Sequence, residues 1–176
     1  MREQSKRFKS NFPTCCLSAS RCSTLMWSYY TDGHRGICVH IDATKEPFDS
    51  ALRVNYDPLY PVISARDGKL DHDLDDQLKL MLLTKSEDWN HECEYRLINL
   101  PTEKPKHVLD DLFKWKEPQL AVVPPAFIVG VTVGACMGDL EIEKIKHICN
   151  ERTTKIPVFK ANCRKNQFDL DFSQIA

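Results

Sequence analysis

The sequence lacks an excess of charge of either sign, since 24 lysines and arginines stand against 25 aspartates and glutamates for a net charge of -1. Binding to nucleic acid draws on surplus Lys and Arg, so this balance argues against an electrostatic nucleic-acid binder. The 176 residues are 42% hydrophobic, with a mean hydropathy of -0.41. These values exclude a miniprotein, a disordered chain and an integral membrane protein, and they predict an ordinary soluble globular protein.

Metal-binding and targeting signals are also missing. The eight cysteines contain no Cys-x-x-Cys pair, so a zinc ribbon or finger has no support and no metal site is expected. We expect mostly buried, free thiols, with Cys38, Cys136 and Cys149 in apolar surroundings. The basic N-terminus is not followed by an apolar run, so a secretory signal is not expected and the predicted location is a reducing cytoplasm.

Common catalytic signatures are absent as well. The chain contains no Gly-x-Gly-x-x-Gly, no lysine-bearing phosphate loop, no Gly-x-Ser-x-Gly and no His-Glu-x-x-His. Three glycines at positions 130, 134 and 138 lie between a predicted strand and a predicted helix, where backbone N–H groups can bind phosphate. The same glycines also suit a tight strand-to-helix turn, and the spacing favours that structural interpretation.

Residues 120–137 carry no charge over a length that could cross a bilayer as a helix. Pro124, Pro125, Gly130 and Gly134 interrupt the stretch, and the residues between them are short and β-branched. The sequence therefore predicts a buried strand over residues 126–133.

The remaining periodicities predict alternating helices and strands. We expect a short helix over residues 25–30 capped by Ser23 or Thr24, an amphipathic helix over residues 70–85 and a short helical piece over residues 108–115. A further helix is expected from Asp139, as its N-cap, to about Arg152. Strands are expected over residues 37–41, 51–56, 93–97, 126–133 and 156–160. The last strand pair with its helix forms a C-terminal β-α-β unit. The prediction is an α+β fold, with an extension over residues 1–15 and a single domain over residues 16–176 whose mixed sheet is flanked by helices.

Two carboxylates close together are the first candidate for chemistry. On a strand, Glu92, Glu94 and Arg96 would form a charged row on one face. Such carboxylates can bind a sugar hydroxyl or stabilise positive charge at an anomeric carbon. The structural alternative is a solvated strand face with an Arg-Glu pair.

A cluster of aromatic and cationic residues is the second candidate. Trp27 and Tyr30 are i, i+3 neighbours on the predicted helix, and His34 and Arg35 follow directly after its turn. Aromatic rings beside cationic donors suit a ligand that combines a ring with a phosphate. An aromatic pair at helical spacing also suits a hydrophobic core.

Four segments resemble the bacterial domain-of-unknown-function family numbered 2971. These are Cys16–Ser18, Leu25–Cys38, Val54–Tyr56 and Trp89–Arg96, and the resemblance extends from about Cys16 to Phe172. Leu17 and Tyr29 depart from residues usual in that family, and the family's usual N-terminal segment with an Asn-Asp-Pro-Phe-like motif has no counterpart here. The resemblance loosely implies a bacterial defence or mobile-element setting.

Residues 92–101 are similar to the Glu-x-Glu strand of ADP-ribosyltransferases, which implies an activity. By that similarity Glu94 would be the catalytic carboxylate, Glu92 would orient the acceptor, and Trp27 or Tyr30 would pack on the nicotinamide ring of NAD. His34, Arg35 and Arg96 complete the expected ligand-binding set. The expectation is an NAD-using transferase, inactive if its front segment is required. The alternative is a non-catalytic interaction or oligomerisation module, in which an unpaired strand edge would favour a homodimer.

Overall fold

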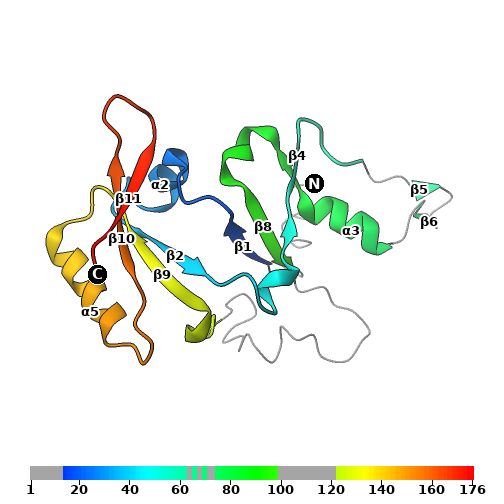
Figure 1. Ribbon diagram of the computed structural model, residues 1–176. Coiled ribbons are helices and arrows are strands. Elements are labelled where there is room, and N and C mark those ends of the chain that lie inside the picture. Colours follow the sequence, from blue (N-terminus) through cyan, green and yellow to red (C-terminus); the bar gives the residue numbers. More distant parts are fainter. Residues whose placement is uncertain (1–13, 63–64, 67–68, 71–73, 99–121) are drawn as a thin grey trace. The chain divides into compact units, whose positions relative to one another are not determined.

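The computed structural model describes residues 14–62, 65–66, 69–70, 74–98 and 122–176 (Figure 1). The chain divides into two compact units, one formed by Met1–Ala19 with Ser50–Leu100 and the other by Ser20–Asp49 with Pro101–Ala176. We call them unit 1 and unit 2 and describe each by itself. The predicted helical piece over residues 108–115 lies outside the described residues, and the predicted boundary after residue 15 stays a prediction.

Unit 1 is built around a three-stranded sheet with the order β1-β8-β3. Its middle strand β8 pairs antiparallel with both neighbours, so that Glu94 lies opposite Ser18 and Arg96 lies between Cys16 and Leu52. A parallel pair, β4 and β7, and a small hairpin, β5 and β6, accompany this sheet. The elements are β1 (Thr14–Ser18), β3 (Leu52–Arg53), β4 (Asn55–Asp57), β5 (Ala65–Arg66), β6 (Lys69–Leu70), α3 (Leu74–Leu83), β7 (Thr84–Ser86), the 3-10 helix η2 (Glu87–Glu92) and β8 (Glu94–Ile98).

Unit 2 holds a four-stranded mixed sheet with the order β11-β10-β9-β2, in which only β9 and β10 are parallel. The elements are α2 (Thr24–Tyr30), β2 (Ile37–Ile41), η3 (Pro125–Phe127), β9 (Ile128–Val133), α5 (Asp139–Asn150), β10 (Val158–Cys163) and β11 (Leu170–Gln174). A further 3-10 turn, η1 (Phe48–Ser50), lies where the two units meet in the sequence. The predicted α+β class, the mixed sheet and the C-terminal β-α-β unit are confirmed.

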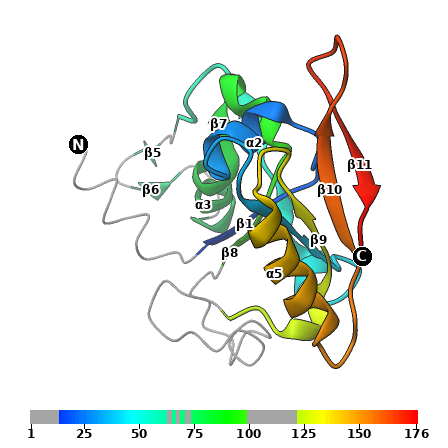
Figure 2. The ribbon, with the colours of Figure 1, turned by 90° about the vertical axis from the view of Figure 1, so that its left-hand side faces the viewer.

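Helices cover both faces of the sheet in unit 2. Val131, Val133 and Val158 lie on one face and pack with α5 through Ile142 and Cys149 (Figure 2). Ala161 lies on the opposite face, where it packs with Leu170 and with Trp27 of α2. The uncharged stretch rejected as a membrane helix thus contains the core strand β9, whose Val131 and Val133 pack in this apolar cluster, while Oγ1 of the buried Thr132 lies 2.8 Å from His40 Nε2. Within the described part of the chain, no helix has the length and apolar character needed to cross a bilayer.

Several boundaries differ from those predicted. The strand expected over residues 51–56 is split into β3 and β4 by the buried Val54. Helix α3 is shorter than the expected 70–85, because the chain enters β7 at Thr84. At α5 the N-cap is Gly138 rather than Asp139, and it has no side-chain cap. The prediction lacks β1, β5, β6, β7 and β11. The first four are short or have little alternation, whereas in β11 the apolar Leu170 and Phe172 alternate with Asp171 and Ser173, a signal that the prediction does not use.

The thiols are less buried than predicted. Of the eight free cysteines, Cys149 is buried, Cys15 and Cys38 are half-buried, and the rest are exposed. Cys136 is among the exposed ones, because it falls in the turn after β9 rather than in the strand itself.

Candidate functional site

The two predicted clusters belong to different units. Glu92, Glu94 and Arg96 lie in unit 1, whereas Trp27, Tyr30, His34 and Arg35 lie in unit 2. Each cluster is therefore described on its own.

The carboxylates of unit 1 are buried rather than on a solvated strand face. Glu92 and Glu94 are each 4% exposed. Glu92 ends η2, and Cys93 has a left-handed backbone with φ 46, so the strand starts only at Glu94. The predicted three-residue row is wrong in this respect, because the kink at Cys93 interrupts the alternation. Glu94 and Arg96 do share a face of β8.

Two cations neutralise these carboxylates. The Arg96 guanidinium donates from Nε to Glu94 Oε1 at 2.7 Å and from Nη2 to Glu94 Oε2 at 3.1 Å. The Lys85 ammonium donates to Glu94 Oε2 at 3.0 Å and also to Glu92 Oε2. A bidentate guanidinium and a shared ammonium thus balance two negative charges with two positive ones, as burial of a charge requires. We call Lys85, Glu92, Glu94 and Arg96 the ion cluster.

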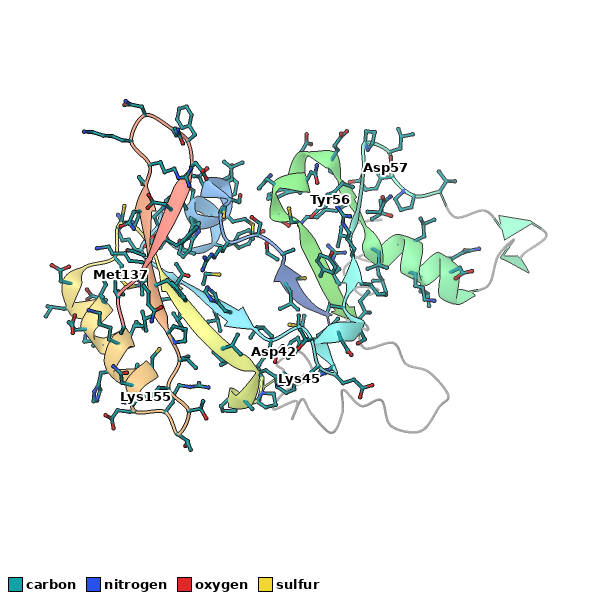
Figure 3. The ribbon with its side chains drawn as sticks, in the orientation of Figure 1. Asp42, Lys45, Tyr56, Asp57, Met137 and Lys155 are labelled. Carbon is teal, nitrogen blue, oxygen red and sulfur yellow. The ribbon has the colours of Figure 1, made fainter. Side chains whose placement is uncertain are left out.

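The ion cluster joins most elements of unit 1. Arg96 also donates to the carbonyl oxygen of Leu82 at the end of α3. Tyr56 Oη, on β4, accepts from the Glu94 backbone N–H at 2.8 Å (Figure 3), and Ser18 Oγ donates to the Glu92 carbonyl oxygen at 2.6 Å. These hydrogen bonds connect β1, β4, β7 and α3 to β8, so the ion cluster stabilises the fold of unit 1.

The electrostatics keep Glu94 ionised. Burial alone would raise the pKa of Glu94, but hydrogen bonds from Arg96, Cys16 and Lys85 outweigh it and lower that pKa to about 2. The pKa of the Cys16 thiol is raised to about 11, mainly because burial removes its hydration and to a smaller extent because the Glu94 carboxylate lies beside it. The carboxylates likewise raise the pKa values of Arg96 and Lys85 against the opposing effect of burial.

In unit 2, Trp27 is part of the hydrophobic core. Trp27 is only 2% exposed and packs with Ala161 and Leu170. Its Nε1–H donates to the Arg21 carbonyl oxygen at 2.7 Å. The helix that carries it starts as predicted, with Ser23 Oγ accepting from the Met26 N–H at 3.3 Å. The packing favours the core interpretation of Trp27 over a ligand platform.

The turn after α2 is held by close backbone packing. His34 has φ 65, and its ring stacks on Trp27 with centroids 6.4 Å apart while Nε2 lies 3.2 Å from Ser28 Oγ. The Cys136 N–H donates to the His34 carbonyl oxygen at 2.9 Å, and a Cβ on Gly134 would lie 2.1 Å from that oxygen. Gly134 is therefore a packing requirement, which supports the turn interpretation of the glycine motif.

Tyr30 and Arg35 are the surface members of this cluster. Tyr30 is 62% exposed. Arg35 Nη1 donates to the Asp32 carbonyl oxygen at 2.7 Å and lies 3.7 Å from the Asp32 carboxylate. These two side chains can be changed without disturbing the core.

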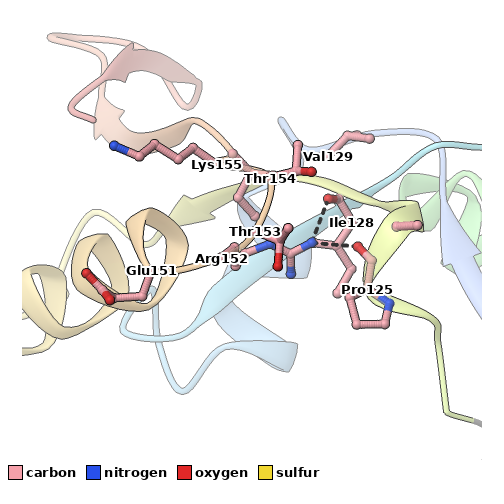
Figure 4. A pocket seen from close by; sticks show the side chains of 10 residues that line it. Pro125, Ile128, Val129, Glu151, Arg152, Thr153, Thr154 and Lys155 are labelled. Atoms are coloured by element: carbon pink, nitrogen blue, oxygen red, sulfur yellow. Dashed lines mark hydrogen bonds between the residues drawn. The ribbon is translucent and has the colours of Figure 1, made fainter.

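Each unit has a cavity lined by described residues. One of about 370 Å³ in unit 1 is lined by Arg53, Val54, Asn55 and Tyr56, beside the Glu94 backbone. The other, of about 710 Å³ in unit 2, is lined by ten residues from 125–129 and 151–156 (Figure 4). Among the residues that the structure describes, no group of three or more His, Cys, Asp or Glu side chains is arranged to hold a metal ion.

Sequence reasoning missed Lys85 and Tyr56 as partners of the carboxylates. Three of the four segments that carry the family resemblance nevertheless meet around Glu94: Cys16–Ser18 on β1, Val54–Tyr56 leading into β4, and Trp89–Arg96 itself. The grouping of these segments could have pointed to Cys16 and Tyr56. Lys85 has no such signal, because only the tertiary fold places it between the two carboxylates.

Comparisons with protein-family models, with curated proteins and with solved structures found no match to this chain.

Proposed function

We propose that the chain is a nucleotide-using transferase of ADP-ribosyltransferase-like type, with NAD as substrate and Glu94 as its catalytic carboxylate. The observation that carries the proposal is the meeting of three motif segments at a carboxylate that is held ionised, with a pKa of about 2. A fixed negative charge stabilises the ribosyl cation that forms while the bond from the anomeric carbon to nicotinamide breaks. Nicotinamide leaves with the bonding electron pair, and the acceptor, oriented by Glu92, then attacks the anomeric carbon and loses its proton.

The geometry sets one condition on this mechanism. Arg96 and Lys85 together donate three hydrogen bonds to Glu94 and the Cys16 thiol donates a further one, so a ribose hydroxyl must replace one of these donors. Lys85 is the movable donor, since its side chain is 23% exposed and its ammonium also lies 5.1 Å from the centre of the Trp89 ring. Ligand binding therefore has to displace the Lys85 ammonium from Glu94 while Arg96 keeps the carboxylate in place.

Calorimetric titration with NAD and with nicotinamide, together with an assay for nicotinamide release, tests the proposal. Binding that is lost in Glu94→Gln is the expected result. Glu143→Gln removes an exposed carboxylate that pairs with Lys146 at 2.9 Å in the described part of the chain, and it serves as the matched control. Absence of NAD binding by the folded chain, or binding unchanged in Glu94→Gln, contradicts the proposal.

A second candidate is a non-catalytic interaction or oligomerisation module. The observation in its favour is that both clusters are explained without a ligand: the ion cluster is balanced in charge, and Trp27 fills the core. In that case the chain binds no nucleotide, and a homodimer in a cytoplasmic setting is the proposed state. Sedimentation of the chain in the absence and presence of NAD separates the two candidates.

A further inference from the structure

The cavity of unit 1 lies where the chain passes from one sheet to another. Strand β3 pairs with β8, whereas β4 pairs with β7, and Val54 is the residue between the two strands. The cavity of about 370 Å³ lies at this change of partner, and its lining is Arg53, Val54, Asn55 and Tyr56. We call it the β3–β4 cavity.

Two hydrogen bonds hold the β3–β4 cavity beside Glu94. The Val54 N–H donates to the Glu94 carbonyl oxygen at 3.0 Å, and the Glu94 N–H donates to Tyr56 Oη at 2.8 Å (Figure 3). Val54 is only 3% exposed, so this wall of the cavity is packed in the interior of unit 1. The cavity therefore has a fixed position next to the residue to which we assign the chemistry.

The charge of the cavity lining is positive. Arg53 carries it, and in the described part of the chain no ion pair involves its guanidinium. Arg53 and Asn55 are both exposed and flank the buried Val54, the alternation of an extended chain that turns both polar side chains to one side. Asp57, the next acidic residue, is outside the lining and accepts the Leu59 N–H at 2.8 Å. The neighbouring ion cluster is balanced in charge, so it leaves the positive charge of Arg53 uncompensated.

The chemistry proposed for Glu94 indicates which anion reaches this cavity. The carboxylate acts at the anomeric carbon of the ribose that carries nicotinamide, and C5′ of the same ribose carries the diphosphate of NAD. A ribose bound at Glu94 therefore brings a diphosphate close to it. A guanidinium binds phosphate oxygens through two parallel N–H donors, and a side-chain amide supplies one more donor. The donors of Arg53 and Asn55 thus match the charged part of the nucleotide.

We propose that the β3–β4 cavity binds the diphosphate of the nucleotide, with the Arg53 guanidinium and Asn55 Nδ2 donating to its oxygens. The inference rests on the proposed function, because Glu94 determines which part of the ligand lies at the cavity. It defines the ligand class of this cavity as nucleoside diphosphates and dinucleotides. Adenosine and nicotinamide, which lack phosphate, make no use of Arg53.

Calorimetric titration of the chain with ADP, with inorganic pyrophosphate and with adenosine tests the cavity without any turnover of NAD. ADP and pyrophosphate are expected to bind, and Arg53→Gln is expected to raise both dissociation constants at least about 10-fold. Asn55→Ala is expected to raise them about 3-fold or more. Arg53→Lys keeps the charge without the paired donors and is expected to recover part of the affinity.

An arginine of unit 2 provides the matched control. Arg164→Gln removes the same charge from a side chain that is 47% exposed, and it is expected to bind ADP and pyrophosphate like the wild type. Circular dichroism of each variant checks that the chain is folded. The inference is overturned if the folded wild-type chain binds neither ADP nor pyrophosphate, if adenosine binds as tightly as ADP, or if Arg53→Gln and Arg164→Gln have the same affinity for ADP.

The assay for nicotinamide release separates this inference from the proposed function. Arg53→Gln is expected to raise KM for NAD about 10-fold and to change kcat less than about 3-fold, because the diphosphate is bound equally before and during bond cleavage. Release that depends on Glu94 but has an unchanged KM in Arg53→Gln overturns the inference and leaves the transferase proposal intact. Binding of ADP and pyrophosphate through Arg53 by a chain that releases no nicotinamide supports the diphosphate site and contradicts the transferase proposal.

Discussion

Replacing Glu94 with glutamine keeps the shape of the side chain but removes its charge from the ion cluster. Arg96 and Lys85 are then opposed by Glu92 alone, which leaves one buried positive charge without a partner. Breaking a buried pair in this way costs about 3 kcal/mol at neutral pH. We therefore expect Glu94→Gln to lower the free energy of unfolding of unit 1 by about that amount at pH 7.

The pH dependence of this loss distinguishes charge from packing. The pKa of Glu94 is about 2 in the folded chain, against 4.5 for an unperturbed glutamate. The lowered pKa contributes stability that is fully present above about pH 4.5 and is lost as the pH falls through 2. The difference corresponds to about 3 kcal/mol, reduced to about 2 kcal/mol by solvent that reaches the cluster beside Lys85.

Urea denaturation followed by circular dichroism at a series of pH values measures this effect. The gap between the wild type and Glu94→Gln is expected to shrink to about half by pH 3. The surface variant Glu143→Gln is expected to track the wild type throughout, because its ion pair is largely exposed. A gap that stays constant from pH 7 to pH 3 would refute the reasoning, since it would show that glutamine disturbs packing alone.

Two further predictions concern the turn in unit 2 and the thiols. Gly134→Ala is expected to lower the free energy of unfolding by more than about 2 kcal/mol, because the new Cβ would lie 2.1 Å from the His34 backbone. Gly138→Ala is expected to lower it by about 1 kcal/mol or less, because there the new Cβ would meet the flexible end of the Glu141 side chain at 2.6 Å. Thermal unfolding compares the two, and equal losses would contradict the clash. Cys16 is expected to react with a maleimide at pH 8 about 100-fold more slowly than a thiol with the ordinary pKa of 9.0, since its own pKa is about 11. Cys22, which is also exposed, is the comparison within the chain. Mass spectrometry of the labelled peptides measures both rates, and Glu94→Gln is expected to speed the reaction of Cys16.

The sequence was most informative where periodicity and capping are local. Strand β2 has the predicted bounds Ile37–Ile41, and α2 starts from the predicted cap at Ser23. The β-branched run before Gly134 gave β9, and the helix that follows gave the β-α-β unit. In these cases hydrogen bonds within a few residues, or an apolar face, specify the element directly.

The candidate site shows why the rest required the tertiary fold. Glu92 and Glu94 were found from their spacing, but a charged pair in sequence is expected to lie in water. Their burial depends on Lys85, which comes from β7, and on Arg96, which also binds the end of α3. Such cations are identified only when distant elements are brought together.

The sequence by itself determined the α+β class, the β-α-β unit and the residues that carry charge and aromatic rings, because those properties follow from local pattern and composition. The tertiary structure alone decided that Trp27 is core, that Cys136 is exposed and that Glu94 is a buried, ionised carboxylate. Burial and pKa depend on which groups meet across the fold, and the local sequence does not contain that information.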